Sequence, residues 1–420
     1  MKILKKKLSN DLILLHEKIP KAESASIGLW VKLGSRFESD EEKGYTHFLE
    51  HMLFKGTENR TSKEQAEDIE RVGGYMNAVT SREYTYYYII VMKSEIRLAM
   101  DILSDMIRNP LLREKDVRSE SSVILEEMKS YEDSPEEFLH DFYFRNLMPK
   151  SSLGLEIIGT EKSVKEATAK KIRKYFESNY SSDRMIISAA GDFSNEEMAS
   201  LAEEYFGDIP KRKTSVSSFS EPDFNLNTYL KRKKLEQVNF LIGTKGIGRN
   251  IQDMARMNLL NCVFGNGMAS RLFQKIREDK GLCYSIQSFS STYSDCGVFT
   301  VSCGTSAEKY EKSVNSIMNE IRLLKKKGIS KEELEFAKSN QKGSMAIGHE
   351  LPENKMMDIA VQEMFFGKYY TMQDKYKIIE NITLEELNEF VHRIFSVNRM
   401  HLSSIGPVSD RVSKDLDLSL

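Results

Sequence analysis

The chain has 420 residues, more than one hydrophobic core usually fills, so two or more domains are expected. Its 61 basic and 63 acidic side chains leave a formal charge of -2. That balance gives no reason to expect nucleic acid or a membrane surface as a partner. Apolar residues make up 40% of the chain and charged residues 30%, which is the composition of a globular protein and excludes a disordered one.

The N-terminal stretch, the apolar runs and the cysteines indicate where in the cell the protein is expected. The N-terminal stretch MKILKKKLSNDLILLHEK has basic residues but lacks the sustained apolar core of a signal peptide. No apolar run is long enough to span a bilayer. The four cysteines form no CxxC pair, so free thiols in a reducing compartment are the simpler interpretation. The sequence therefore predicts a soluble, cytoplasmic protein.

The predicted elements alternate between strands and helices along the first half. A hairpin is expected around Ser9-Asn10-Asp11. β-branched and aromatic runs predict further strands, so that the expected strands are 2–8, 12–18, 24–33 and 84–92. Helical periodicity predicts helices at 44–54, 62–72, 94–108, 114–131, 135–146 and 163–179. This arrangement predicts an α+β fold in which a mainly antiparallel sheet packs against helices.

The chain repeats itself once. Residues 168–191 (TAKKIRKYFESNYSSDRMIISAAG) and 383–406 (TLEELNEFVHRIFSVNRMHLSSIG) both begin with Thr, continue as an amphipathic helix and end in a short apolar strand. A second pair, Met106-Ile107-Arg108 and Glu320-Ile321-Arg322, lies at nearly the same offset of 214 to 215 positions. Two matches at one offset indicate two homologous halves.

The segment between the halves is rich in Ser, Pro and charged residues and has little apolar periodicity, which is typical of a linker. We therefore expect an N-terminal catalytic half at 1–212, a linker at 213–225 and a C-terminal half at 226–420. The second half has no counterpart of a metal site. The position 215 residues after His51 is Asn266, in a stretch without His or Glu. Catalysis is therefore predicted to belong to the first half.

A metal-binding motif lies in the predicted helix 44–54. His47 and His51 are one turn apart, so both imidazoles project from one face of the helix, a spacing that suits two ligands of a zinc ion. Glu50 lies beside them, where it can take a proton from a water activated by the metal. The order His-x-x-Glu-His inverts the commoner His-Glu-x-x-His but places the same groups on one turn.

A catalytic zinc needs a third protein ligand and an open fourth position. The predicted helix 114–131 offers Glu120 and Glu127, which are seven residues apart and share a face, whereas Glu126 points elsewhere. From the residues alone, a solvated charge on an amphipathic helix is the better interpretation of any one of these carboxylates. The pattern by itself therefore leaves the third ligand open.

The motifs together resemble a known family. His47-Phe-Leu-Glu-His51, followed by Phe54-Lys-Gly-Thr57 and the acidic helix, resembles the M16 metallopeptidases, which include pitrilysin, insulin-degrading enzyme and the mitochondrial processing peptidases. Residues 34–38 (GSRFE) and 73–83 (GGYMNAVTSRE) fit the same pattern. The resemblance covers nearly the whole chain, with the length of a short, two-half bacterial-type member.

The resemblance implies a role for each of several residues. It places the third ligand at Glu127, 76 positions beyond His51, and gives Glu120 a supporting role in orienting a ligand imidazole. It implies one Zn²⁺ per chain, which two imidazoles and a carboxylate also favour. Glu50 is then the general base.

Substrate-binding residues follow from the same resemblance. An edge strand at Asn77, Ala78 and Val79 is expected to pair with the substrate backbone, although Asn77 is also a common turn residue. Arg277 is expected to hold a substrate carbonyl, with an ion pair to a neighbouring carboxylate as the alternative. Tyr284 is expected to donate to the oxyanion, with a buried core ring as the alternative.

The expected activity is zinc-dependent endopeptidase hydrolysis of unfolded oligopeptides. The resemblance implies a clam-like chamber and a homodimer or paired chains that enclose it. A partner-dependent subunit that trims targeting peptides and a non-catalytic structural subunit are the alternatives from other classes. The sequence leaves the physiological substrate and the cleavage preference open.

Overall fold

The structure is a computed structural model that describes residues 3–212, 219–408 and 416–420. Part of the predicted linker, residues 213–218, lies outside the described residues. The contacts divide the chain into two compact units. The first unit consists of Met1–Ser130, Leu155–Ser218 and Gly348–Tyr369, and the second of Tyr131–Gly154, Phe219–Ile347 and Tyr370–Leu420.

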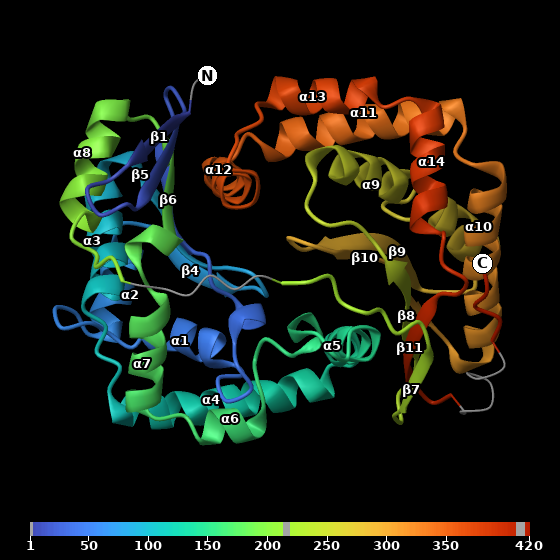
Figure 1. Cartoon of the computed structure of the whole chain (residues 1–420), viewed down its shortest axis with the longest axis horizontal. Helices are drawn as coiled ribbons and strands as arrows, with labels where there is room; N and C mark the ends of the chain where they lie inside the picture. The colour runs from blue at the N-terminus through green and yellow to red at the C-terminus, as the bar shows by residue number, and fades with distance from the viewer. Residues whose placement is uncertain (1–2, 213–218, 409–415) are drawn as a thin grey trace. The chain divides into compact units, whose positions relative to one another are not determined.

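A six-stranded sheet forms the centre of the first unit (Figure 1). Its strands are β1 (Leu4–Lys7), β2 (Ile13–Lys18), β3 (Ser24–Val31), β4 (Tyr75–Thr80), β5 (Thr85–Met92) and β6 (Met185–Gly191). They lie in the order β1-β2-β6-β3-β5-β4, with every pair antiparallel except β2 and β6. Strand β4 is therefore an edge strand. The predicted hairpin and the strands predicted at 24–33 and 84–92 are present.

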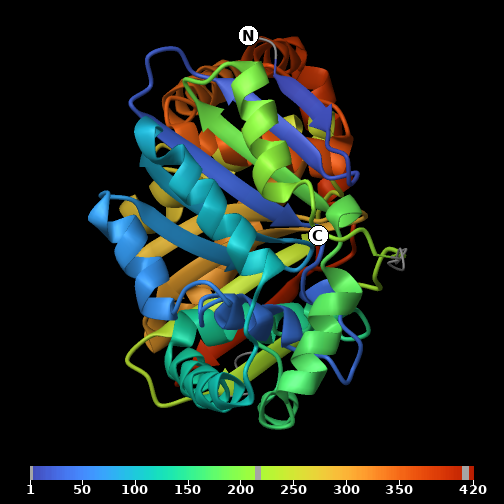
Figure 2. The same cartoon turned by 90° about the vertical axis from the view of Figure 1, so that its left-hand side faces the viewer.

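The helices of the first unit are α1 (Tyr45–Leu53), α2 (Ser62–Arg71), α3 (Ile96–Arg108), α4 (Glu114–Asp133, which continues past the boundary), α6 (Glu161–Lys165), α7 (Ala169–Asn179) and α8 (Asn195–Phe206). Helix α3 is strongly amphipathic, because its apolar residues recur every three or four positions. These residues pack on the face of the sheet that carries Ile27 and Leu29. Helix α8 covers the same face, and both helices lie in front of the strands in Figure 2.

The single helix predicted at 163–179 is wrong, because the chain forms two helices there. The Thr168 side chain accepts a hydrogen bond from the backbone N–H of Lys171 and so begins α7. Thr160 and Ser163 form a capping box that begins the short helix α6. Each cap satisfies backbone donors that the first turn of a helix leaves unpaired, so each cap starts a new helix. The apolar pattern continues across this break and does not reveal it.

The second unit repeats the same path with a five-stranded sheet. Its strands are β7 (Thr228–Arg232), β8 (Val238–Lys245), β9 (Ser285–Thr292), β10 (Gly297–Thr305) and β11 (His401–Gly406). Their order is β7-β11-β8-β10-β9, with only β7 and β11 parallel. Strands β11, β8, β10 and β9 thus correspond to β6, β3, β5 and β4 of the first sheet. The predicted α+β class with two homologous halves is confirmed.

The helices of the second unit are α5 (Pro135–Leu147), α9 (Ile251–Phe264), α10 (Tyr310–Lys327), α11 (Lys331–Gly348), α13 (Met372–Asn381) and α14 (Leu384–Ile394), with a π-helical segment at Phe273–Glu278. Helices α7 and α14 begin at Thr168 and Thr383, and the side chains of both residues act as N-caps. The two copies of the repeated sequence therefore form the same helix and strand in each unit.

Two corresponding helices are exchanged between the units. Helix α12 (Pro352–Phe366) comes late in the sequence but packs on β6, β3 and β2 of the first sheet, on the face opposite α3. Helix α5 comes early but packs on β8 and β11 of the second sheet. A glycine in the central strand makes room for each helix: a Cβ at Gly28 would lie 2.6 Å from Met356 Sδ, and a Cβ at Gly243 would overlap the Tyr143 hydroxyl.

Candidate metal centre

Helix α1 is held at its N-terminus by a carboxylate from outside the helix. Gly44 precedes the helix with φ 84° and provides no side-chain cap. Both carboxylate oxygens of Glu38 accept backbone N–H bonds at 2.8 Å, from Gly44 and Thr46. Burial raises the pKa of Glu38 to about 8, against the lowering effect of the bonds from Thr46 and Gly44.

The two imidazoles of α1 lie side by side, with ring centroids 4.6 Å apart. The apolar residues on the other side of the helix are fully buried, so its rotation about its own axis is fixed. Burial, with a smaller contribution from His51, lowers the pKa of His47 to about 3. His47 is therefore neutral at physiological pH, the form in which an imidazole binds a metal.

Glu127 on α4 faces both rings. Its Oε1 lies 3.8 Å from His47 Nε2, and its Oε2 lies 3.6 Å from His51 Nε2. One ligand atom from each of the three residues lies within 4.8 Å of the others, and this is the one such group of metal-binding side chains in the described ranges. Zinc ligands lie about 2.0–2.2 Å from the ion, which places two ligands of one ion about 3–4 Å apart. Two imidazoles and a carboxylate at these separations fit a zinc ion.

Glu120 lies two turns before Glu127 on the same side of α4 and is 3% exposed. Its Oε2 is 3.2 Å from His51 Nδ1, and its Oε1 is 2.5 Å from Lys55 Nζ. Glu126, by contrast, points to solvent and pairs with Lys129. A carboxylate at Nδ1 orients the ring and leaves Nε2 toward Glu127.

Glu50 lies on the same turn of α1 and is bonded to the edge strand. Its Oε2 accepts a hydrogen bond from the Thr80 hydroxyl, and the backbone of Thr80 also bonds to the carboxylate. Burial raises the pKa of Glu50, while the bonds from Thr80 and the charge of His51 act in the opposite direction. A carboxylate with a raised pKa is a better proton acceptor near neutral pH.

The predicted substrate strand lies on the edge strand β4. Asn77 and Val79 are exposed, whereas Ala78 is buried. The Asn77 side chain accepts a bond from the Ala78 N–H at 2.8 Å and donates to the Tyr75 hydroxyl at 2.6 Å. Asn77 is a strand residue, so the alternative of a turn is wrong.

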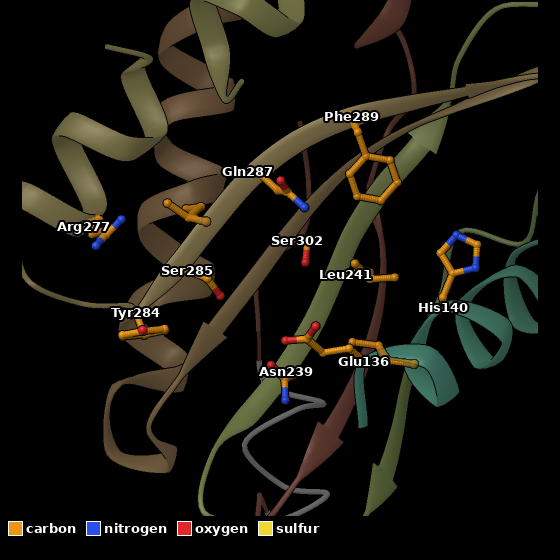
Figure 3. Close-up of a pocket in the computed structure, with 12 residues that line it drawn as sticks. Glu136, His140, Asn239, Leu241, Arg277, Tyr284, Ser285, Gln287, Phe289 and Ser302 are labelled. Atoms are coloured by element: carbon orange, nitrogen blue, oxygen red, sulfur yellow. The ribbon is translucent and has the colours of Figure 1, made fainter. Parts of the chain in front are cut away.

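Arg277 and Tyr284 line one pocket of the second unit (Figure 3). The pocket has a volume of about 510 Å³ and lies over β8, β9 and β10 beside α5. Tyr284 is 76% exposed, so the alternative of a buried core ring is wrong. The Arg277 guanidinium stacks over the Phe273 ring at 4.5 Å and lies 3.9 Å from Glu278, a distance typical of a weak surface pair. The remaining lining residues are Glu136, Leu139, His140, Asn239, Leu241, Ser285, Ile286, Gln287, Phe289 and Ser302.

The structure thus brings together His47, Glu50, His51, Glu120 and Glu127 in the first unit. It places Arg277 and Tyr284 together in the second. The sequence analysis missed the contact of Thr80 with Glu50. Strand alternation offered a signal for it, because Thr80 shares the face of β4 that carries the buried Ala78.

Comparison with known proteins agrees with this geometry. The family described as Insulinase (Peptidase family M16) matches residues 13–161, and the Peptidase M16 inactive domain matches residues 166–341. An uncharacterized zinc protease of Bacillus subtilis is 35% identical over 387 residues, which cover 92% of this chain and 94% of that protein. A second one, from Rickettsia felis, is 34% identical over 93% of this chain and 94% of its own length.

The fold is shared with solved structures of lower sequence identity. A protease from Helicobacter pylori has a TM-score of 0.89 and 21% identity, and covers 97% of this chain and 99% of its own. A peptidase M16 inactive domain from Pseudomonas fluorescens has a TM-score of 0.91 and 17% identity, and covers 97% and 98%. The chain belongs to peptidase family M16, as a bacterial-type member with two domains. Among the described residues, no helix has the length and apolar character needed to cross a membrane.

Proposed function

We propose that the chain is a zinc-dependent endopeptidase that holds one Zn²⁺ on His47, His51 and Glu127. The observation that carries this proposal is the convergence of two imidazoles from α1 and one carboxylate from α4. The names of the curated relatives, uncharacterized zinc proteases of Bacillus subtilis and Rickettsia felis, support the same metal. When bound, zinc supplies Lewis acidity that lowers the pKa of water and polarises a peptide carbonyl.

Glu50 is the proposed general base. Its carboxylate accepts the proton of the attacking water and then delivers it to the nitrogen of the departing amine. The Thr80 hydroxyl donates to one oxygen of the carboxylate and so fixes its orientation. Burial of Glu50 supports this role because it raises the affinity of the carboxylate for a proton.

The substrate is proposed to be an unfolded oligopeptide that pairs with β4. The Ala78 N–H donates to the side-chain oxygen of Asn77, and a substrate carbonyl can replace that oxygen as the acceptor. Asn77 would then bond to substrate backbone. Recognition through the backbone fits many sequences, because main-chain bonds do not depend on the side chains.

Arg277 and Tyr284 are proposed to bind the substrate from the second unit, Arg277 at a carbonyl and Tyr284 at the developing oxyanion. The exposure of Tyr284 supports this, because its hydroxyl is open to a ligand. Removal of one oxyanion donor typically lowers kcat by about 10²–10³. We expect Tyr284→Phe to lower kcat by a factor of that order. An unchanged kcat/KM would show that Tyr284 does not bind the oxyanion.

A closed chamber, a homodimer and a cytoplasmic location complete the proposal. A chamber that excludes folded proteins would confine the activity to short or unfolded chains. No observation favours a structural subunit or a partner-dependent processing subunit, and the set of His47, Glu50, His51 and Glu127 is complete. Hydrolysis by the purified chain alone would exclude both alternatives.

The test combines metal content with peptide hydrolysis. The purified chain should contain about one zinc per chain, lose hydrolysis on chelation and regain it when zinc is added. Glu50→Gln should keep the zinc and lose about 10²–10⁴-fold in kcat/KM, because general acid–base catalysis contributes about that much. Thr46→Ser, on the same helix, is the matched control. A chain that hydrolyses peptide equally well after complete removal of the metal would contradict the proposal.

A further inference from the structure

Lys55 lies just beyond the C-terminus of α1 and reaches the metal centre through Glu120. The Lys55 N–H donates to Met52 O at 3.1 Å, and the Lys55 carbonyl accepts from Arg113 Nη2 at 3.2 Å. The backbone of this residue is thereby fixed between α1 and the start of α4. Its ammonium group lies 2.5 Å from Glu120 Oε1.

The environment of Glu120 makes this ion pair important. Its side chain is 3% exposed, and a buried carboxylate without a counter-ion has a large desolvation cost. In the described part of the chain, its ion-pair partners are His51 and Lys55. An imidazole that binds a metal is neutral. Of these two partners of Glu120, Lys55 is therefore the one that always has a positive charge.

The two oxygens of Glu120 have different partners. With Oε1 held by Lys55, Oε2 is left 3.2 Å from His51 Nδ1. A ring that donates from Nδ1 presents Nε2 as its free lone pair, and Nε2 is the atom that faces Glu127. The contact with Lys55 at Oε1 thus leaves Oε2 of Glu120 facing the histidine.

We propose that Lys55 is a positioning residue of the metal centre, acting on His51 through Glu120. This inference rests on the proposed zinc site and adds a residue that the metal-binding motif does not include. Two effects oppose each other when the charge of Lys55 is removed. The loss of a supporting contact weakens metal binding by about 10–100-fold, whereas removal of a nearby positive charge strengthens it. Glu120 and the imidazole ring of His51 would separate this charge from an ion bound at His51 Nε2, so we expect the weakening to be larger.

The test is a double-mutant cycle on zinc affinity, measured by competition with a zinc-binding dye. Lys55→Met should weaken zinc binding about tenfold or more, and Lys55→Arg should restore most of it because the charge and the donors are kept. In a Glu120→Gln background, Lys55→Met should cause no further weakening, because the carboxylate on which it acts is gone. Lys129→Met is the matched control. It removes the lysine that pairs with Glu126, an exposed carboxylate on α4, the helix that also carries Glu120.

The melting temperature of each metal-free variant separates positioning from a loss of stability. A Lys55→Met chain that binds zinc as tightly as the wild type would overturn the inference. So would an equal loss in the Glu120→Gln background. A wild-type chain that binds no zinc would instead overturn the metal centre as a whole, and with it the role of Lys55. If Lys55→Met does not fold, Lys55→Gln, which also removes the charge, takes its place in the same cycle.

Discussion

The two units share the order of their central strands, yet only one brings together a candidate set of metal ligands in its described residues. In the first unit, α1 places two imidazoles and a carboxylate on one turn, between β3 and β4. In the second, the position 215 residues after His51 is Asn266, in the glycine-rich turn that follows α9 between β8 and β9. The second unit instead has a pocket that contains Arg277 and Tyr284. A repeated fold thus provides the scaffold, and a few side chains decide its chemistry.

The largest expected effect is the loss of zinc affinity when a metal ligand of the first unit is removed. His51→Ala removes a metal ligand, so zinc affinity should fall by more than the roughly 10–100-fold that the loss of a supporting contact costs. Asn266→Ala, at the equivalent position of the second unit, should leave zinc affinity unchanged. Zinc titration of both purified variants checks this. Equal losses in the two variants would mean that the metal is not confined to the first unit.

An intermediate effect is expected for the glycines beneath the exchanged helices. Gly243→Ala would drive a Cβ into the Tyr143 hydroxyl and to 2.6 Å from Phe299 O, so it should destabilise the chain by about 1–3 kcal/mol. Gly28→Ala meets the end of Met356, which is flexible and can move aside, so its cost should be smaller. Denaturant unfolding ranks the two variants. The reverse order would show that α5 packs less tightly on its sheet than α12 does.

The smallest effect is a pH dependence that arises in the second sheet. Burial lowers the pKa of His401 to about 4, and both ring nitrogens have hydrogen-bond partners, Asn225 O at 2.7 Å and Ser403 Oγ at 2.9 Å. The equivalent residue of the first sheet is Ile186, which does not titrate.

In the unfolded chain His401 has a pKa of about 6.5, which is above its pKa in the fold. Above pH 6.5 the ring is neutral in both states, and the contribution of His401 to stability is fully present. It is lost progressively as the pH falls from about 6.5 to about 4. The melting temperature of wild type should therefore fall more steeply over this range than that of His401→Gln. Identical slopes would show that His401 keeps its ordinary pKa in the fold.

Much of the fold could be predicted from local patterns. Period-two and period-3.6 apolar patterns predicted the hairpin, β3, β5 and most helices of the first half, and the repeat predicted that the second half copies them. The break between α6 and α7 could not be seen in the apolar pattern, because it depends on the Thr168 cap. The exchange of α5 and α12 was also out of reach, since amphipathicity shows that a helix is half-buried but not against which sheet.

The candidate site divides in the same way. The spacing of His47 and His51 follows from helix geometry, so it could be seen in the sequence. The carboxylate of Glu127 could not be distinguished from a solvated charge until the resemblance to a family was used. The contacts of Thr80 with Glu50 and of Lys55 with Glu120 join segments that are separated by 30 and 65 positions. No local pattern predicts such contacts, because they depend on how the elements pack.

The exchange of helices has a consequence for the chain while it is still being synthesised. The first sheet turns Trp30, Tyr86 and Ile186 toward α12, and all three are buried beneath or beside that helix. A nascent chain that has emerged only through β6 has every strand of this sheet but not its cover, which ends at residue 366. From the end of β6 at Gly191 to the end of α12 at Phe366, about 175 further residues must be synthesised before α12 can cover that apolar surface.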